Sequence, residues 1–231
     1  MRLYELLLGH QREGIAFPEM SDFDFFYNNS GDHLYYPKPS SMLSRLVKQY
    51  KLREGRAIDL GCGDGRNTFF LAEAGFCVIA VDLSCVAIKK IKRKKRDRNI
   101  KNIICLLSDV RTLDWAPSSY DLVVMSTLLD HLERNEIYDL VSRVKRWVKI
   151  GGYVYASVFT VDDPGFAVRI RGGRRPYVSP TADFVRTYFE YGELKSLFAD
   201  FSIIYYKETF EEDLSHGPPH YHGIARLVCQ K

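Results

Sequence analysis

Residues 57–84 have the sequence AIDLGCGDGRNTFFLAEAGFCVIAVDLS, and this stretch decides the fold. A short apolar strand ends at Asp59, and three glycines follow at alternate positions, Gly61, Gly63 and Gly65. Glycine lets the backbone turn sharply, and it lets a ligand lie against the peptide groups without an intervening side chain. A helix is predicted to begin near Arg66. The segment therefore predicts a strand, a ligand-binding turn and a helix.

From residue 56 onward, short apolar runs alternate with helical stretches. Strands separated by helices of this length are typical of βαβ units and a parallel sheet. The last two runs, 201–208 and 222–230, are joined by a predicted loop and can pair antiparallel. We predict an α/β fold with a doubly wound, mostly parallel, seven-stranded Rossmann-like sheet and an antiparallel last strand. The other predicted strands are 57–60, 78–83, 103–107, 121–126 and 153–159, and the predicted helices are 66–75, 84–97, 134–149 and 191–199.

Two segments interrupt this rhythm. Residues 1–50 include an aromatic, acidic stretch, SDFDFFYNNSGDHLYYPKPS, and residues 161–190 are rich in Gly, Pro and Arg. We predict an N-terminal helical and aromatic cap over 1–50, and a main domain over 51–231 with a small substrate lid inserted at about 161–190. Strand-end loops of this topology open on one side, so the cap and the lid are expected to close the substrate pocket.

Acidic residues follow the second and third predicted strands. Asp82 stands where this topology directs a carboxylate to the hydroxyls of a ribose, and Asp109 stands where a carboxylate or backbone amide can meet an adenine amino group. A dinucleotide-binding fingerprint requires a third glycine at position 66, which is Arg66. The pattern thus favours a nucleoside cofactor other than NAD, and the remaining alternative is a glycine loop that is only a tight turn.

The run Asp59-Leu-Gly61-Cys-Gly63-Asp-Gly65-Arg66-Asn67 resembles the first motif of class I S-adenosylmethionine (SAM)-dependent methyltransferases. Its Gly-Arg-Asn ending and the final HGPPHYHGIARLV resemble the TehB-like group. The resemblance implies that the main domain binds SAM, with the glycine loop facing the methionine part. It also implies that Asp82 binds the ribose and that Asp109 lies by the adenine. Asp59 and Asn67 are implied to order the loop. The expected cofactor-binding residues are Tyr27, Asp59, Gly61, Gly63, Gly65, Asn67, Asp82, Leu83, Asp109, Val110 and Ser126.

The resemblance further implies an enzyme that transfers the methyl group of SAM to a small-molecule acceptor by in-line displacement. After the fourth predicted strand comes MSTLLDHLER, which lacks the Asn/Asp-Pro-Pro-aromatic signature of base-amino methyltransferases and so argues against DNA. We predict His131 in this segment as the catalytic base, with Asp130 as a second candidate. The alternative is that His131 caps the next helix or contacts the cofactor. The predicted acceptor-binding residues are Tyr36, Arg171 and His222.

The net charge of +4 is too small to indicate an anionic partner. The basic run KKIKRKKRDRNIKN at 89–102 is the main argument for the alternative function, an RNA methyltransferase. Its helix would have a solvated polar face in any case, and neither a dedicated binding domain nor interleaved aromatic residues accompany it. Nucleic acid is therefore not the predicted partner. A third possibility is a non-catalytic SAM-binding module.

The spacing of the cysteines and histidines bears on the redox compartment and on metal binding. The five cysteines have no paired spacing, which is typical of free thiols in a reducing compartment and predicts a cytoplasmic location. No apolar stretch approaches ~20 residues, so no membrane span is predicted. His220 and His222 are spaced to share one strand face, but no companion Cys or acid stands at matching spacing, so no metal site is predicted.

Overall fold

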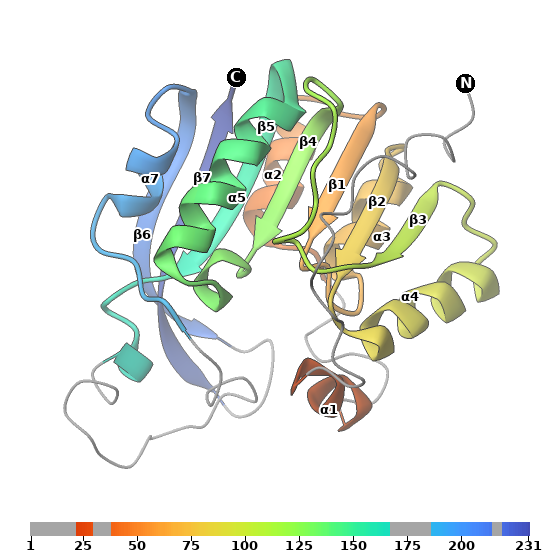
Figure 1. The fold of residues 1–231 in the computed structure, drawn as a ribbon, viewed down its shortest axis with the longest axis horizontal. Coiled ribbons are helices and arrows are strands. Elements are labelled where there is room, and N and C mark those ends of the chain that lie inside the picture. The colour runs from red at the N-terminus through yellow and green to blue at the C-terminus, as the bar shows by residue number, and fades with distance from the viewer. Residues whose placement is uncertain (1–21, 30–37, 167–185, 214–218) are drawn as a thin grey trace.

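The computed structural model describes residues 22–29, 38–166, 186–213 and 219–231. Within these residues, seven strands form one sheet in the order β3-β2-β1-β4-β5-β7-β6 (Figure 1). Strands β1 to β5 pair in parallel, whereas β7 is antiparallel to both of its neighbours. The predicted fold class is confirmed. The strands are β1 (Arg56–Leu60), β2 (Cys77–Asp82), β3 (Ile103–Leu107), β4 (Tyr120–Ser126), β5 (Val148–Phe159), β6 (Ser202–Asp213) and β7 (His220–Gln230).

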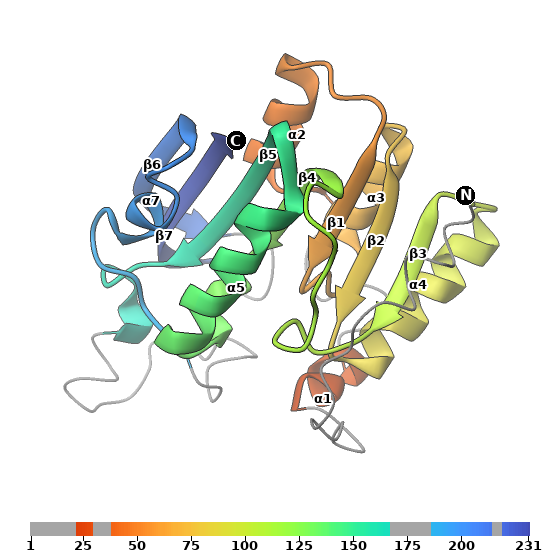
Figure 2. The same ribbon diagram turned by 45° about the horizontal axis from the view of Figure 1, so that its top comes forward.

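Helices cover both faces of the sheet (Figures 1 and 2). On one face lie α5 and α7, and on the other lie α2, α3 and α4. A short helix, α1, lies at the edge where the parallel strands end (Figure 1). The bounds are α1 (Asp22–Asn29), α2 (Ser41–Gln49), α3 (Arg66–Glu73), α4 (Cys85–Asp97), the 3-10 helix η1 (Leu129–His131), α5 (Arg134–Trp147) and α7 (Glu193–Leu197).

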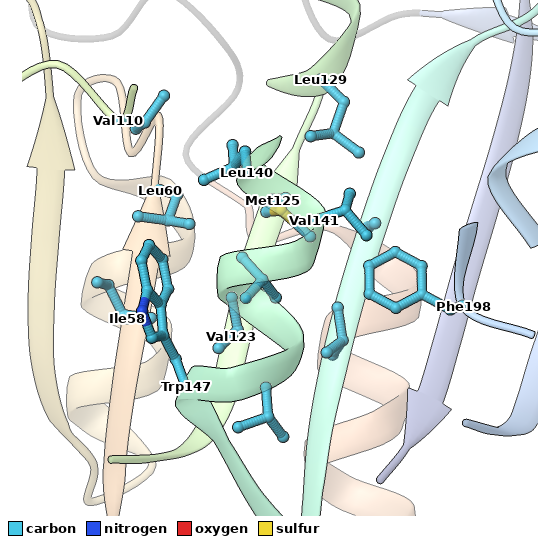
Figure 3. Packing of buried hydrophobic residues seen from close by; sticks show 14 of the residues in the cluster. Ile58, Leu60, Val110, Val123, Met125, Leu129, Leu140, Val141, Trp147 and Phe198 are labelled. Atoms are coloured by element: carbon cyan, nitrogen blue, oxygen red, sulfur yellow. The ribbon is translucent and has the colours of Figure 1, made fainter. Parts of the chain in front are cut away.

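Alternating strand residues divide the core into two layers, because successive side chains of a strand point to opposite faces. Ile58 and Val123 pack with Trp147 on the α5 face, and Ala57 and Leu122 pack on the α2 and α3 face. Figure 3 shows the first layer, in which side chains of α5 lie over β1, β4 and β5. Helices thus cover both faces of the sheet in the described part of the chain, so a ligand is expected at an edge of the sheet.

The strand order reverses at β1. The chain runs outward from β1 to β2 and β3, and then returns to place β4 on the other side of β1. In open α/β sheets, ligands bind outside the carboxyl ends of the strands at such a reversal. The expected position of a ligand is therefore the crevice beyond β1 and β4.

The two C-terminal strands are longer than the predicted 201–208 and 222–230. The expected loop was wrong at both ends, because pairing continues from Thr209 opposite Ile224 to Asp213 opposite His220. Residues 209–213 show no regular alternation of polar and apolar residues, because polar side chains occur at successive positions of this segment. As a result, an antiparallel hairpin extends past the end of β5.

The Gly151-Gly152 pair lies inside β5 and not before it. The strand begins at Val148, directly after α5, and its pairing with β4 shifts register between Tyr120 and Leu122. Gly151 has a φ of +79° in this irregularity. The glycines therefore mark a β-bulge-like distortion inside a strand that begins at Val148 and not at the predicted residue 153.

The predicted cap and lid are only partly within the described residues. Residues 167–185 of the predicted lid and residues 1–21 and 30–37 of the predicted cap lie outside them. Helix α2 packs Leu43, Leu46 and Val47 into the same core layer as α3 and α4. The boundary at residue 50 stays a prediction, although this packing joins α2 to the sheet domain. In the described part of the chain, every helix is too short or too polar to cross a membrane.

The core layer under α5 yields a stability prediction. Trp147 is fully buried, so Trp147→Ala should lower the free energy of unfolding by about 3–5 kcal/mol, through lost burial and a residual cavity. Tyr138 on the same helix is 57% exposed, and Tyr138→Ala serves as the matched control. Urea denaturation followed by circular dichroism measures both. Equal stabilities of the two variants would contradict the packing described.

Candidate active site

A pocket lies at the carboxyl ends of the parallel strands, at the reversal of strand order. The pocket brings together most of the residues predicted from the sequence, from α1, the glycine loop and the ends of β2, β3 and β4. Those predicted residues are Tyr27, Gly61, Gly63, Asn67, Asp82, Leu83, Asp109, Val110, Ser126 and His131. Asp59 and Gly65 lie outside its walls.

The glycine loop turns through left-handed backbone conformations. Gly61 and Gly63 have φ values of +67° and +55°, which side chains rarely tolerate. A Cβ on Gly63 would stand 2.6 Å from the hydroxyl oxygen of Tyr27. The aromatic side chain of α1 can approach the loop this closely only because residue 63 lacks a side chain.

Asp82 connects the loop to the end of β2. Its Oδ2 accepts a hydrogen bond from the backbone N–H of Gly63 at 2.8 Å, and its Oδ1 accepts one from Ser84 at 2.9 Å. Burial raises the pKa of Asp82 to about 6, against the lowering effect of these two bonds. Each carboxylate oxygen has a second acceptor site, so Asp82 can hold the loop and accept from ligand hydroxyls at the same time.

Asp109 is already engaged by a neighbour. The side chain of Arg111 donates to both of its oxygens, with Nε at 3.0 and 2.9 Å and a terminal nitrogen at 2.6 Å from Oδ2. The adjacent Ser108 hydroxyl is buried in the pocket wall and makes no hydrogen bond to any described residue. An unsatisfied buried hydroxyl calls for a partner, so Ser108 is a polar contact that a ligand can satisfy.

Asp59 lies beneath the loop and not in the pocket. Its Oδ2 accepts a hydrogen bond at 2.6 Å from the hydroxyl of Thr68, which lies in the first turn of α3. Burial raises the pKa of Asp59 to about 7, and the Thr68 bond opposes this. Asn67 also has an ordering role, since its Oδ1 accepts a bond from the backbone N–H of Ser40 at 2.9 Å. Asp59 and Asn67 thus join the loop to its surroundings.

His131 lines the pocket at the end of η1. Its ring meets that of Phe23 from α1 edge to face, with centroids 5.2 Å apart. Burial lowers the pKa of His131 to about 3, and nearby Arg186 lowers it further. The imidazole is therefore neutral at physiological pH, and this environment disfavours the imidazolium that a general base must form. Asp130 is fully buried and lies outside the pocket walls, with Arg186 3.7 Å from its Oδ2.

Helix α1 is fastened to the start of α4. The Oδ1 of Asp24 accepts hydrogen bonds from the Ser84 hydroxyl at 2.5 Å and from the Val86 backbone N–H at 3.1 Å. Asp24 is buried, and this contact places Phe23 and Tyr27 in the pocket wall. Helix α1, part of the aromatic stretch, therefore contributes two aromatic side chains to the wall of the pocket.

The predicted acceptor-binding residues do not line this pocket within the described structure. Tyr36 and Arg171 lie outside the described residues, and His222 lies on β7 in a separate polar cluster. Several wall residues were missed by the sequence analysis, although most neighbour a predicted residue. They are Cys62, Asp64, Arg66, Ser108, Arg111, Thr127, Leu128 and Leu132.

The burial of Asp59 yields a pH prediction. Its folded-state pKa of about 7 lies above the ~3.9 of an unfolded aspartate, so the folded protein binds more protons between these values. This term lowers the free energy of unfolding as pH rises from about 4 to about 7, by up to ~1.4 kcal/mol per pH unit. Asp59→Asn keeps an acceptor for Thr68 and cannot ionise. Its stability relative to the parent should therefore rise across this window.

Urea denaturation at several pH values checks this. Asp97→Asn is the control, because Asp97 is an exposed residue at the end of α4. The control should follow the parent curve throughout. Parallel curves for Asp59→Asn and the parent would be inconsistent with the buried, protonated state of this carboxyl.

Comparisons with known proteins agree with this geometry. A family model described as a methyltransferase domain matches residues 57–152. The cypemycin N-terminal methyltransferase of Streptomyces sp is 33% identical over 145 residues, which are 62% of this chain and 56% of that protein. The probable SAM-dependent methyltransferase TehB of Haemophilus influenzae is 26% identical over 158 residues, 68% of this chain and 49% of TehB. The chain thus spans about half the length of these curated relatives.

Solved structures share the fold. The crystal structure of Haemophilus influenzae TehB has a TM-score of 0.68 at 21% identity, over 84% of this chain and 62% of that chain. A Burkholderia thailandensis 1,6-didemethyltoxoflavin-N1-methyltransferase, crystallised with 1,6-didemethyltoxoflavin and S-adenosylhomocysteine, has a TM-score of 0.61 at 20% identity, over 83% and 77% of the two chains. The glycine loop, the acids after β2 and β3, the strand order and these matches converge. Residues 57–152 match the methyltransferase-domain family, and these findings support a class I SAM-dependent methyltransferase domain of the TehB-like kind, a family whose cofactor is SAM.

Proposed function

We propose that this chain transfers a methyl group from SAM to a small-molecule acceptor by in-line displacement. The observation that carries the proposal is the pocket at the reversal of strand order. The glycine loop, Asp82 and Asp109 line this pocket together with His131 and Phe23. One part of this pocket fits a nucleoside cofactor. The other part offers aromatic and imidazole groups to an acceptor.

The residues present fit SAM. The side-chain-free turn at Gly61 and Gly63 leaves peptide groups open to the methionine part, and Asp82 retains acceptor capacity for ribose hydroxyls. Ser108 supplies a buried hydroxyl beside Asp109, where adenine is expected. Since Arg111 engages the Asp109 carboxylate, the hydroxyl of Ser108 and the backbone near Val110 are the more available contacts for the base.

When bound, SAM supplies an activated methyl group on a sulfonium, so the protein's task is binding and orientation. Helix α1 covers the pocket through Phe23 and Tyr27 and would exclude water from the methyl group. Holding an acceptor in line is worth up to ~7–11 kcal/mol for well-oriented reactants. Residues 1–50 as a cap and 161–190 as a lid remain our proposal for how the acceptor side is closed.

For His131, the environment favours a positioning role over proton abstraction. A pKa of about 3 means that a proton moved to this imidazole would be poorly held. A neutral imidazole can still accept or donate a hydrogen bond to the acceptor or cofactor. We therefore propose an acceptor whose nucleophile needs no general base, such as a thiolate or a nitrogen that is unprotonated at physiological pH.

The relatives support a small acceptor. Their names specify the N-terminus of cypemycin in one case and N1 of a didemethyltoxoflavin in another. The first part of the basic run that favoured RNA lies on α4, where Ile88, Ile91 and Lys94 are buried. Most of the other basic residues of this helix are exposed, as on an ordinary solvated helix face. All five cysteines are free thiols, which supports our proposal that the enzyme works in the cytoplasm.

Asp82 provides a binding test. Charge-assisted hydrogen bonds contribute ~1.5–3 kcal/mol each, so Asp82→Ala should weaken SAM binding at least tenfold by calorimetry. Asp97 is an exposed residue at the end of α4, so Asp97→Ala should bind SAM as the parent does. Thermal melting should verify that both variants fold. Unchanged affinity in a folded Asp82→Ala variant would remove this carboxylate from the cofactor site.

The activity has its own test. Full-length protein is expected to bind SAM in the micromolar range and not NAD, and to form S-adenosylhomocysteine with members of a panel of small amines, thiols and phenols. Label from methyl-tritiated SAM should appear in the small molecule. Label found only in RNA, at low salt, would instead favour the RNA methyltransferase. NAD binding without SAM binding would refute the assignment.

A further inference from the structure

Outside the cofactor pocket, the hairpin of β6 and β7 carries a cluster of histidines and acids. Antiparallel pairing places Asp213 directly opposite His220, and the alternation of strand side chains puts His222 on the same face. These residues belong to the part of the hairpin that extends past the end of β5 (Figure 1). Six residues separate Asp213 from His220 in the sequence, and strand pairing brings the two side by side.

The ring of His222 is held in a defined orientation. Its Nδ1 lies 2.6 Å from Oδ2 of Asp163, and both side chains are buried. A carboxylate at this distance accepts the Nδ1–H and leaves Nε2 as the unprotonated nitrogen of the neutral ring, which faces Nε2 of His220 at 2.9 Å. Metal-ligating histidines characteristically make this contact through the ring nitrogen that does not bind the metal.

The remaining ligand atoms converge on the Nε2 of His222. The Nε2 of His220 lies 2.9 Å away and Oδ2 of Asp213 lies 4.0 Å away, and all three atoms are within 4.8 Å of one another. With metal–ligand bonds of ~2.0–2.2 Å, neighbouring ligand atoms of a tetrahedral zinc ion are about 3.3 Å apart. The observed separations bracket this spacing, so small side-chain rotations suffice to surround an ion.

The backbone around the cluster is closely packed. A Cβ on Gly223 would stand 2.5 Å from the backbone nitrogen of Asp163 and 2.6 Å from Oγ1 of Thr160. The turn that carries Asp163 can therefore lie against β7 only because residue 223 is glycine. Phe159 covers the ring of His222, with centroids 4.6 Å apart. The orienting carboxylate is thus fixed by the fold, which is what a preformed site requires.

We propose that His220, His222 and Asp213 bind a divalent transition-metal ion of the zinc type, with Asp163 as the carboxylate that orients His222. Two imidazoles with one carboxylate favour zinc-like ions, because Mg²⁺ and Ca²⁺ prefer oxygen ligands alone. A tetrahedral ion held by three protein groups has one further position, which water or an acceptor group can take. The site is separate from the proposed SAM pocket and goes beyond the proposed function.

Metal titration tests the site directly. Tag-free full-length protein is stripped with EDTA and titrated with ZnSO₄ in competition with a chromophoric chelator. The parent should bind one Zn²⁺ per chain. His220→Ala should weaken binding at least about a hundredfold, Asp213→Asn at least about tenfold, and the orienting variant Asp163→Asn about 10–100-fold.

Glu212→Gln is the matched control, since this exposed acid neighbours Asp213 on the opposite strand face and should keep parental affinity. Asp82→Ala should also keep it, which separates this test from that of the SAM pocket. Circular dichroism verifies folding, and Co²⁺ in place of zinc should give the intense visible absorption of a tetrahedral site. A folded parent without stoichiometric Zn²⁺ binding, or a folded His220→Ala variant with parental affinity, would overturn the proposal.

Discussion

The backbone turn between β1 and α3, and the hydrogen bond that holds it, constrain the rest of the site. The N–H of Gly63 donates to Asp82 at the end of β2, so this hydrogen bond links the loop after β1 to the neighbouring strand. Below the turn, Asp59 accepts from Thr68 in α3, and above it Tyr27 approaches the bare Cα of Gly63. A side chain at this position would collide with the Tyr27 hydroxyl, so Tyr27 and the loop could not keep this close contact.

Both acidic and basic side chains line the pocket, and Arg111 already pairs with Asp109, whereas burial raises the pKa of Asp82 to about 6. A cationic ligand stabilises ionised carboxylates, and by linkage the ionised carboxylates strengthen its binding. A sulfonium cofactor suits such walls. His131 is kept neutral by the same burial, so the acceptor side carries no added positive charge from this ring.

The elements around the sheet separate two tasks. The parallel strands and their loops form the cofactor half, where this chain most resembles its relatives. Helix α1 and the hairpin of β6 and β7 extend from the same edge of the sheet and lie outside the segment that the methyltransferase-domain model matches (Figure 1). The proposed metal site belongs to this second group, because its ligands come from the extended hairpin and its orienting Asp163 follows β5.

From the sequence alone came the doubly wound, mostly parallel sheet and most of the residues that line the pocket, because glycine spacing, strand-end acids and apolar periodicity are local signals. The sequence did not identify Thr68 as the partner of Asp59, since only tertiary packing shows that this acid faces α3 and not the pocket. Nor could it find companions for His222. Asp163 lies 59 residues earlier, and only the pairing of β6 with β7 and the close approach at Gly223 bring these side chains together. Contacts between distant segments depend on tertiary packing, which no local pattern encodes.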